Sequence, residues 1–381
     1  MRRVRVAIKA VQGAAVVLLA ASITLSLPAG PGVASVASGR SADRVSSTVS
    51  GQLAGVAATS VHNAWAVGDT GSRSGKTLIL AWNGTSWTPV PSPSPGTGDG
   101  LEAVTASSAS NAWAVGVTGR GKTLIERWSG HLWKLAASPD PGHGGGLDGV
   151  AATSPGNAWA VGATSRGKTL TEHWNGHSWK LVPSPSPGTA DALTGVAVTS
   201  ATNAWAVGYT GTGGPGHTLI SHWNGAKWTR VPCPSPAVGS FLTGISATSR
   251  QSAWAVGYNV LPHSNDTKSL ILHWNGKRWS RSASPSPGVT AGLFGVSAAS
   301  ATSAWAVGAS YQSGRNSVLI LRWNGHRWTR ATGPSLPGSN VLRDVAVASG
   351  RAWAVGSAAT GSVLIAAWNG ATWQSAADRL K

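Results

Sequence analysis

Carboxylate side chains are the first residues in this sequence that could do chemistry, because glycosidases use two of them, one as acid and one as nucleophile or base. The 381-residue chain has only 12 Asp and Glu. Two pairs occupy equivalent places in successive copies of a repeated pattern, Glu126 with Glu172 and Glu102 with Asp148. Either pair could converge in the fold, although ordinary polar positions explain them more simply. We therefore predict no catalytic residue and keep a glycan-cleaving enzyme as the alternative.

Three other patterns could carry chemistry, but their spacing or number argues against a functional site. The Gly-Lys-Thr segment at 75–77, and its two copies, look like the end of a phosphate-binding loop, but the required upstream glycine and the following helix are missing. Cys233 is the only cysteine, which argues against a thiol enzyme. Histidines precede a tryptophan in three repeats, one per repeat, and so cannot gather around an ion. We predict neither a cofactor nor a metal site.

Basic residues recur in one loop of the repeat and form our first group of candidate binding residues. On a closed ring these loops would share one rim, where many weak contacts to a polyanion could add together. A simple solvated rim is the alternative. The candidates are Lys76, Lys122, Lys168, His217, Lys268 and Arg315, and the same loops also carry Arg73, Arg120 and Arg166.

The most variable position of the repeat comes just before this loop and gives the second group. It holds Asp69 in the first repeat and Tyr209 and Tyr258 in the fourth and fifth. Variation inside an otherwise uniform repeat is where a site grafted on a symmetric scaffold is expected. Asp69, Tyr209 and Tyr258 are therefore predicted ligand-binding residues.

A repeat of about 48 residues must position these side chains. Ala-Trp-Ala-Val-Gly occurs seven times, and two further tryptophan columns follow the same period, which accounts for all 21 Trp. A period of this size indicates stacked supersecondary units that cannot bury their apolar faces alone.

One copy of the repeat reads as four short β-strands, over 53–60, 63–68, 77–82 and 87–90. Asn83-Gly84 predicts a type I′ turn between the last two, and the proline-rich segment 91–96 ends the unit. Four antiparallel strands make one propeller blade, so the sequence predicts an all-β, seven-bladed β-propeller over 53–378. The expected blades are approximately 53–98, 101–145, 147–190, 193–240, 242–290, 293–340 and 342–378.

Residue size along the repeat agrees with this geometry. The first strand is rich in Ala, Gly, Val and Ser, which fit near the axis where blades converge, whereas Trp fills the wider gaps further out. We predict that the Trp columns are packing residues. The array begins with a first strand and ends with a fourth, so closure is expected from packing of blade one against blade seven, without strand exchange.

The N-terminal segment predicts export. A basic start, an apolar run over 14–27 and small residues near 33–38 are typical of a signal peptide over 1–38, followed by a polar linker over 39–52. An uncleaved anchor is the alternative. We expect an extracellular monomer with no stable membrane span once the signal is removed. The formal net charge of +18 favours anionic partners, although nothing indicates specific nucleic acid binding.

The repeat resembles those of secreted bacterial β-propellers related to bacterial neuraminidase repeat proteins. The resemblance covers about 53–377 and rests on Asn-Ala-Trp-Ala-Val-Gly and on Trp-Asn-Gly followed by Trp. The neuraminidase repeat has the motif S-x-D-x-G-x-T-W, whose second half matches 84–87, whereas Trp82 takes the place of its Asp. Because all seven repeats share that change, the resemblance does not imply sialidase activity. We expect a secreted, non-enzymatic module that binds a glycan, an anionic cell-envelope polymer or a protein through its loop faces.

Overall fold

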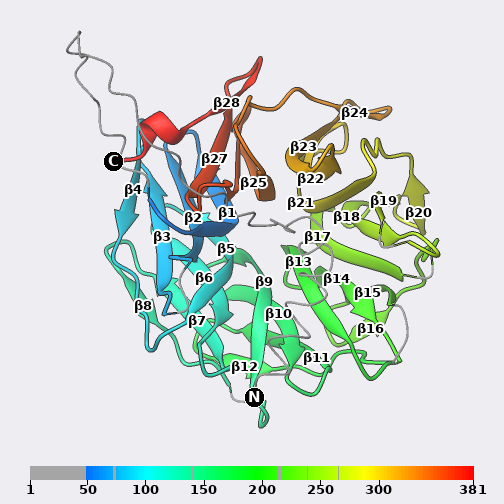
Figure 1. The fold of residues 1–381 in the computed structure, drawn as a ribbon. Helices are drawn as coiled ribbons and strands as arrows, with labels where there is room; N and C mark the ends of the chain where they lie inside the picture. The colour runs from blue at the N-terminus through cyan, green and yellow to red at the C-terminus, as the bar shows by residue number, and fades with distance from the viewer. Residues whose placement is uncertain (1–48, 72–73, 140, 213–215, 238, 265) are drawn as a thin grey trace, which may run out of the picture.

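The protein is a seven-bladed β-propeller, as the sequence predicts (Figure 1). A computed structural model describes residues 49–71, 74–139, 141–212, 216–237, 239–264 and 266–381. Seven sheets of four consecutive antiparallel strands surround a common axis, and the chain visits them in order, so that the last blade lies beside the first.

Each blade runs outward from its first strand at the axis. The strands are β1 Gln52–Ser60, β2 Asn63–Asp69, β3 Thr77–Trp82 and β4 Trp87–Val90; β5 Gly100–Ser108, β6 Asn111–Val117, β7 Thr123–Trp128 and β8 Trp133–Leu135; β9 Gly145–Ser154, β10 Asn157–Thr164, β11 Thr169–Trp174 and β12 Trp179–Leu181; β13 Ala192–Ser200, β14 Asn203–Thr210, β15 His217–Trp223 and β16 Trp228–Arg230; β17 Gly239–Ser249, β18 Ser252–Val260, β19 Thr267–Trp274 and β20 Trp279–Ser282; β21 Thr290–Ser300, β22 Ser303–Gln312, β23 Arg315–Trp323 and β24 Trp328–Arg330; β25 Val341–Ala348, β26 Arg351–Ser357, β27 Val363–Trp368 and β28 Trp373–Ser375. A 3₁₀ turn, η1 Ala377–Arg379, follows the last strand.

The tryptophans pack between blades, as predicted. In six of the seven interfaces the second-strand Trp of one blade meets the third- and fourth-strand Trp of the next: Trp113 lies 4.9 Å from Trp174 and 5.0 Å from Trp179 between ring centroids. At the seam Trp353 meets Trp82, at 6.3 Å. The Trp174 indole N–H donates to the carbonyl of Pro155. Because aromatic pairs contribute beyond their buried area, this repeated triad is a main source of cohesion between blades.

Small residues let the blades converge at the axis, which confirms the prediction for the first strand. A Cβ added to Gly55 would lie 2.9 Å from the Cα of Ala103 in the next blade, and one on Gly295 would lie 2.7 Å from the Cα of Asp344. Real Cβ atoms do not approach so closely, so these glycines set the spacing of the blades.

The predicted type I′ turn is wrong. The turn between β3 and β4 has four residues, and only Gly84 has a positive φ, of 101°. Asn83 instead uses its side chain, whose Oδ1 accepts hydrogen bonds from the backbone N–H of Thr85 and Ser86 at 3.0 and 2.9 Å. An Asn side chain that holds its own turn removes the need for a second left-handed residue.

Both ends of the described chain cross the seam between blades one and seven, in addition to the expected packing. Each of the two blades has its own four strands, so no strand is exchanged. Ahead of β1, Ser50 forms an antiparallel bridge with Ser362, and the Val363 N–H donates to the carbonyl of Val49 at 3.0 Å. The end of the segment that we predicted to be a linker thus takes part in closure.

Two further contacts close the ring at its outer and inner edges. At the outer edge Leu380 forms a parallel bridge with Trp87, and the Lys381 N–H donates to the Trp87 carbonyl at 3.1 Å. Near the axis Asp344 accepts a hydrogen bond from the Val56 N–H at 2.9 Å. The seam is therefore fixed at three radii.

The predicted signal peptide and most of the predicted linker lie outside the described residues. Within the part of the chain that is described, no helix has the length and apolar character needed to cross a membrane.

Candidate functional site

A cavity of about 370 Å³ lies on the propeller axis and is lined by first-strand residues of all seven blades. Its volume falls within the range of small-molecule sites. Three features of the repeat build it: a buried Leu, the residue that follows, and a glycine of the second strand.

The residue after the buried Leu is a β-bulge in every blade. In blade four, for example, Leu193 pairs with Gly208 and Gly195 pairs with Val207, so Thr194 has no partner on the neighbouring strand. A bulge re-aims the side chain of its extra residue. Here all seven extra residues line the axial cavity: Ala54, Glu102, Asp148, Thr194, Thr243, Phe294 and Arg343.

The glycine of the Ala-Trp-Ala-Val-Gly motif makes room for this bulge. A Cβ on Gly162 would lie 2.0 Å from the carbonyl oxygen of Gly146 across the pair of strands, and the equivalent glycines show the same conflict. Any side chain at this position would force the first strand away. The glycine of the repeated Ala-Trp-Ala-Val-Gly motif therefore maintains the position of the bulged residue, whose type varies from blade to blade.

The bulged residues divide the cavity wall into two chemical halves. Glu102 and Asp148 come from blades two and three and Arg343 from blade seven, whereas Phe294 comes from blade six. Thr194 and Thr243, from blades four and five, donate their hydroxyls at 2.8 Å to backbone carbonyls of the next blade, which makes them structural ties.

Aromatic residues cover the cavity wall at blades four and five. Phe241, at the start of β17, contacts Tyr209 with ring centroids 5.3 Å apart and an edge-on geometry, and it stacks on Tyr258, also at 5.3 Å. Tyr209 is half-buried and Tyr258 only 4% exposed. The structure thus brings together the two predicted tyrosines, joined by a phenylalanine that the sequence analysis did not identify.

Carboxyl groups dominate the opposite wall. Burial, together with the nearby charge of Glu102, raises the pKa of Asp148 to about 8. Burial lowers the pKa of Arg343, while the charges of Glu102 and Asp69 act in the opposite direction. Burial and the charge of Asp148 raise the pKa of Tyr209 to about 12, so its hydroxyl stays protonated at neutral pH. Three carboxyl groups, those of Glu102, Asp148 and Asp344, therefore line the cavity together with one guanidinium, that of Arg343.

Asp69, the third predicted residue of the variable column, does not line the cavity, unlike the two tyrosines. It lies at the end of β2, where it accepts hydrogen bonds of 2.7 Å from the Gln52 side chain and from the Gly71 N–H.

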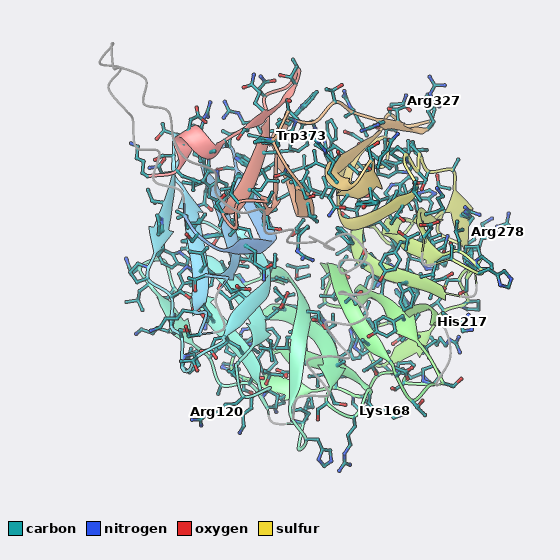
Figure 2. All side chains as sticks on the ribbon, in the orientation of Figure 1. Arg120, Lys168, His217, Arg278, Arg327 and Trp373 are labelled. Carbon is teal, nitrogen blue, oxygen red and sulfur yellow. The ribbon has the colours of Figure 1, made fainter. Side chains whose placement is uncertain are left out.

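The predicted basic residues do not reach the cavity wall. They stand at or next to the start of the third strand of each blade, two strands away from the axis, and Figure 2 shows Lys168 and His217 at the margin of the ring. Lys168 Nζ donates to the carbonyl of Gly188 at 2.6 Å, and Lys268 Nζ donates to those of Gly288 and Val289 at 3.1 Å. Lys76 and Lys122 are exposed in the same column, and Arg315 is exposed two residues earlier in its blade. Arg73 lies outside the described residues.

Glu126 and Glu172 do not form a pair. Each is 0% exposed in a different blade interface, where a serine of the preceding connector, Ser92 or Ser138, donates a hydrogen bond to its carboxyl group. Burial raises their pKa values to about 8 and about 7. They are interior polar residues and not a catalytic pair, which agrees with the simpler interpretation of the sequence.

Side chains before the third-strand Trp also pack within the blades. His173 stacks on Trp159 at 4.3 Å, and Arg127 lies over the ring of Trp113 at 5.1 Å. Among the described residues, no group of three or more His, Cys, Asp or Glu could hold a metal ion.

Known structures share the fold of this chain at low sequence identity. No family model matches it, and no curated protein does. A polysaccharide lyase of family PL25, an ulvan lyase bound to a GlcA–Rha3S chain, has a TM-score of 0.57 at 8% identity, covering 86% of this chain and 96% of that one. YCF48 bound to a D1 peptide has a TM-score of 0.54 at 13% identity, covering 84% and 92%. The BP39L lectin from Burkholderia pseudomallei has a TM-score of 0.52 at 12% identity, covering 86% and 98%. At these identities the likeness establishes the class, a β-propeller with neighbours among glycan-related propellers, and nothing finer.

Proposed function

We propose that the protein is a secreted, non-enzymatic binding module that holds a glycan at the axial cavity. One observation carries the proposal: the aromatic wall of Tyr209, Phe241 and Tyr258 shares a small cavity with the polar groups of Glu102, Asp148 and Arg343. Sugar rings present apolar faces that stack on aromatic side chains and hydroxyls that hydrogen-bond to carboxylates and guanidinium groups.

The charge of the cavity selects among glycans. Near pH 7 most of Asp148 is protonated because its pKa is about 8, while the carboxyl groups of Glu102 and Asp344 line the cavity together with Arg343. The wall therefore offers no excess of positive charge, and an acidic sugar would meet repulsion from the carboxylates. Neutral or amino sugars are the ligands we expect here.

Titration of the purified protein with neutral, amino and acidic oligosaccharides would test this proposal. Phe241→Ala should weaken binding about tenfold, because an aromatic stacking contact contributes ~1 kcal/mol or somewhat more. Tyr311→Ala is a matched control, since Tyr311 does not line the cavity. Equal binding by both variants and the wild type would contradict the site, and a preference for acidic sugars would contradict the charge argument.

A glycan-cleaving enzyme remains the second candidate, favoured by one observation. Glu102 and Asp148 occupy the bulge position in adjacent blades, and the raised pKa of Asp148 suits a general acid at neutral pH, with Glu102 as base or nucleophile. Turnover of a bound glycan that disappears in both Glu102→Gln and Asp148→Asn would establish this function. If the glycan is unchanged after prolonged incubation, the non-enzymatic binding module is the function that the result supports.

A further inference from the structure

Positive charge is concentrated on one side of the ring. Residues 192–340, which form blades four to six, contain eleven Lys and Arg but a single acidic residue, Asp266. Residues 53–190, which form blades one to three, contain nine Lys and Arg against seven Asp and Glu. The net charge of the whole sequence hides this asymmetry. In blades four to six the excess of Lys and Arg gives a positive electrostatic potential that acidic residues do not offset.

Arginine occupies one position of the outermost strand only in these three blades. Arg230, Arg281 and Arg330 each follow a buried Trp by two residues and pair with the same position of the third strand. All three are exposed. The other blades hold uncharged residues there: Pro89, Leu135, Leu181 and Ser375.

Hollows on the outer flank of two of these blades place a second basic side chain beside this arginine. In blade six a hollow of about 490 Å³ is lined by Arg315 and Arg330, and in blade four one of about 460 Å³ is lined by His217 and Arg230. Blade five has Lys268 and Arg281 at the positions of His217 and Arg230, whereas Arg315 of blade six lies two residues earlier in its strand. The corresponding hollow of blade two, of about 240 Å³, has Leu135 in place of the arginine.

The turns of the outer strands add cations in a fixed backbone geometry. Asn275 Oδ1 accepts hydrogen bonds from the N–H groups of Lys277 and Arg278 at 3.1 and 3.0 Å, and Asn324 holds Arg327 in the same way at 2.9 Å. Figure 2 shows Arg278 and Arg327 at the outer margin of the ring. Because each turn is held by its own side chain, the charged residues are presented alike in successive blades.

We propose that the outer surface of blades four to six binds a linear polysaccharide carrying sulfate or phosphate esters. Guanidinium groups form paired hydrogen bonds with such oxyanions, and one exposed arginine at the same position of three successive blades matches a polymer with regularly spaced anionic groups. We call this surface the arginine wall, and it consists of Lys227, Arg230, Arg278, Arg281, Arg327 and Arg330.

Charge alone would also attract nucleic acid, but the wall lacks what a single strand requires. Single-stranded nucleic acids are held by bases stacked on exposed aromatic faces. The indoles of the outer strands in these blades, Trp228, Trp279 and Trp328, are each only 4% exposed. The observations therefore favour a polysaccharide.

Binding of size-fractionated heparin and of a phosphodiester-linked polysaccharide, measured by calorimetry at two salt concentrations, would test the arginine wall. The triple variant R230S/R281S/R330S, which introduces the residue of blade seven, should weaken binding about tenfold or more and reduce its salt dependence. The matched control K134S/R166S/K180S removes three exposed cations from blades two and three and should bind as the wild type does. Unchanged Trp fluorescence and unfolding midpoints would show that both variants fold.

Three results would overturn the proposal. Equal losses in the two triple variants would mean that only net charge matters. Affinity that does not rise with heparin chain length would mean that the hollows do not act together. Tighter binding of single-stranded DNA of matched charge would assign the wall to nucleic acid instead. Phe241→Ala, which affects only the axial cavity, should leave heparin binding unchanged, so failure of one site does not imply failure of the other.

Discussion

Replacing Glu126 with Leu should stabilise the propeller and remove part of its dependence on pH. The Glu126 side chain is 0% exposed in β7, and Leu80, Leu272 and Leu321 take the same register position in their own blades. Burial raises the pKa of Glu126 from 4.5 to about 8, although a hydrogen bond from Ser92 acts in the opposite direction. Folding near neutral pH must therefore add a proton to this group or bury its charge.

The sign and size of the effect follow from linkage. Because the pKa is higher in the folded than in the unfolded chain, the contribution of Glu126 is fully favourable below pH 4.5 and is lost as the pH rises through about 8. At ~1.4 kcal/mol per pH unit, this single group lowers the free energy of unfolding by about 3 kcal/mol between pH 5 and pH 8. Leu cannot titrate, and it matches the apolar residues that other blades place there.

Urea denaturation of the wild type and of Glu126→Leu at both pH values would measure this difference. Glu126→Gln is the matched control, since it keeps a hydrogen-bonding partner for Ser92 but does not titrate. Both variants should be less sensitive to pH than the wild type by about 3 kcal/mol, and the Leu variant should be the more stable of the two. Parallel pH profiles for wild type and Glu126→Gln would refute the reasoning, because they would show that this carboxyl group does not change its pKa on folding.

Three further predictions concern the bulge and the seam. Gly162→Ala should lower the free energy of unfolding by ~1–3 kcal/mol and weaken ligand binding near Asp148, because its Cβ would displace the bulged strand; calorimetry and urea midpoints measure both, and an unaffected midpoint would contradict it. Asp344→Ala, studied at pH 5, below its raised pKa of about 7, should cost ~1–3 kcal/mol by leaving the Val56 N–H unpaired, and an equally stable variant would show that this bond does not hold the seam. Deletion of Leu380 and Lys381 should lower the melting temperature and increase hydrogen exchange in blade one, in particular near Trp87; exchange unchanged there would mean that the tail bridge is dispensable.

The ring could be predicted from the sequence because its determinants are repeated. Seven copies of one pattern place a strand boundary at each turn residue, and the sizes of Gly and Trp report the distance from the axis directly. The turn at Asn83 was assigned wrongly because an Asn-Gly pair is compatible both with a two-residue hairpin and with a side-chain-held loop of four residues. Dipeptide chemistry alone does not distinguish these two loops.

Only part of the axial site could be predicted from the repeat. Tyr209 and Tyr258 were found through their variation within the repeat, whereas Phe241 and Arg343 were not. The alternating pattern of a strand assigns its residues to two faces of the sheet. It does not predict a β-bulge, which turns the side chain of one residue toward the axis. One pattern did contain the information: the position after the buried first-strand Leu holds Ala, Glu, Asp, Thr, Phe and Arg, a variation as wide as that at the end of the second strand.

Departures from the repeat therefore locate function better than the repeat itself. Blades four and five are aromatic at the axis, through Phe241 and the two tyrosines, and blades four to six are arginine-rich at the outer edge. Packing cannot require both features, since the other blades hold non-aromatic residues at the Phe241 and tyrosine positions and uncharged residues at the arginine position, and they keep the same strand pairing. A ring in which one arc carries both departures has a defined binding side, and the two sites can be tested separately because Phe241 and Arg281 lie at opposite ends of one blade.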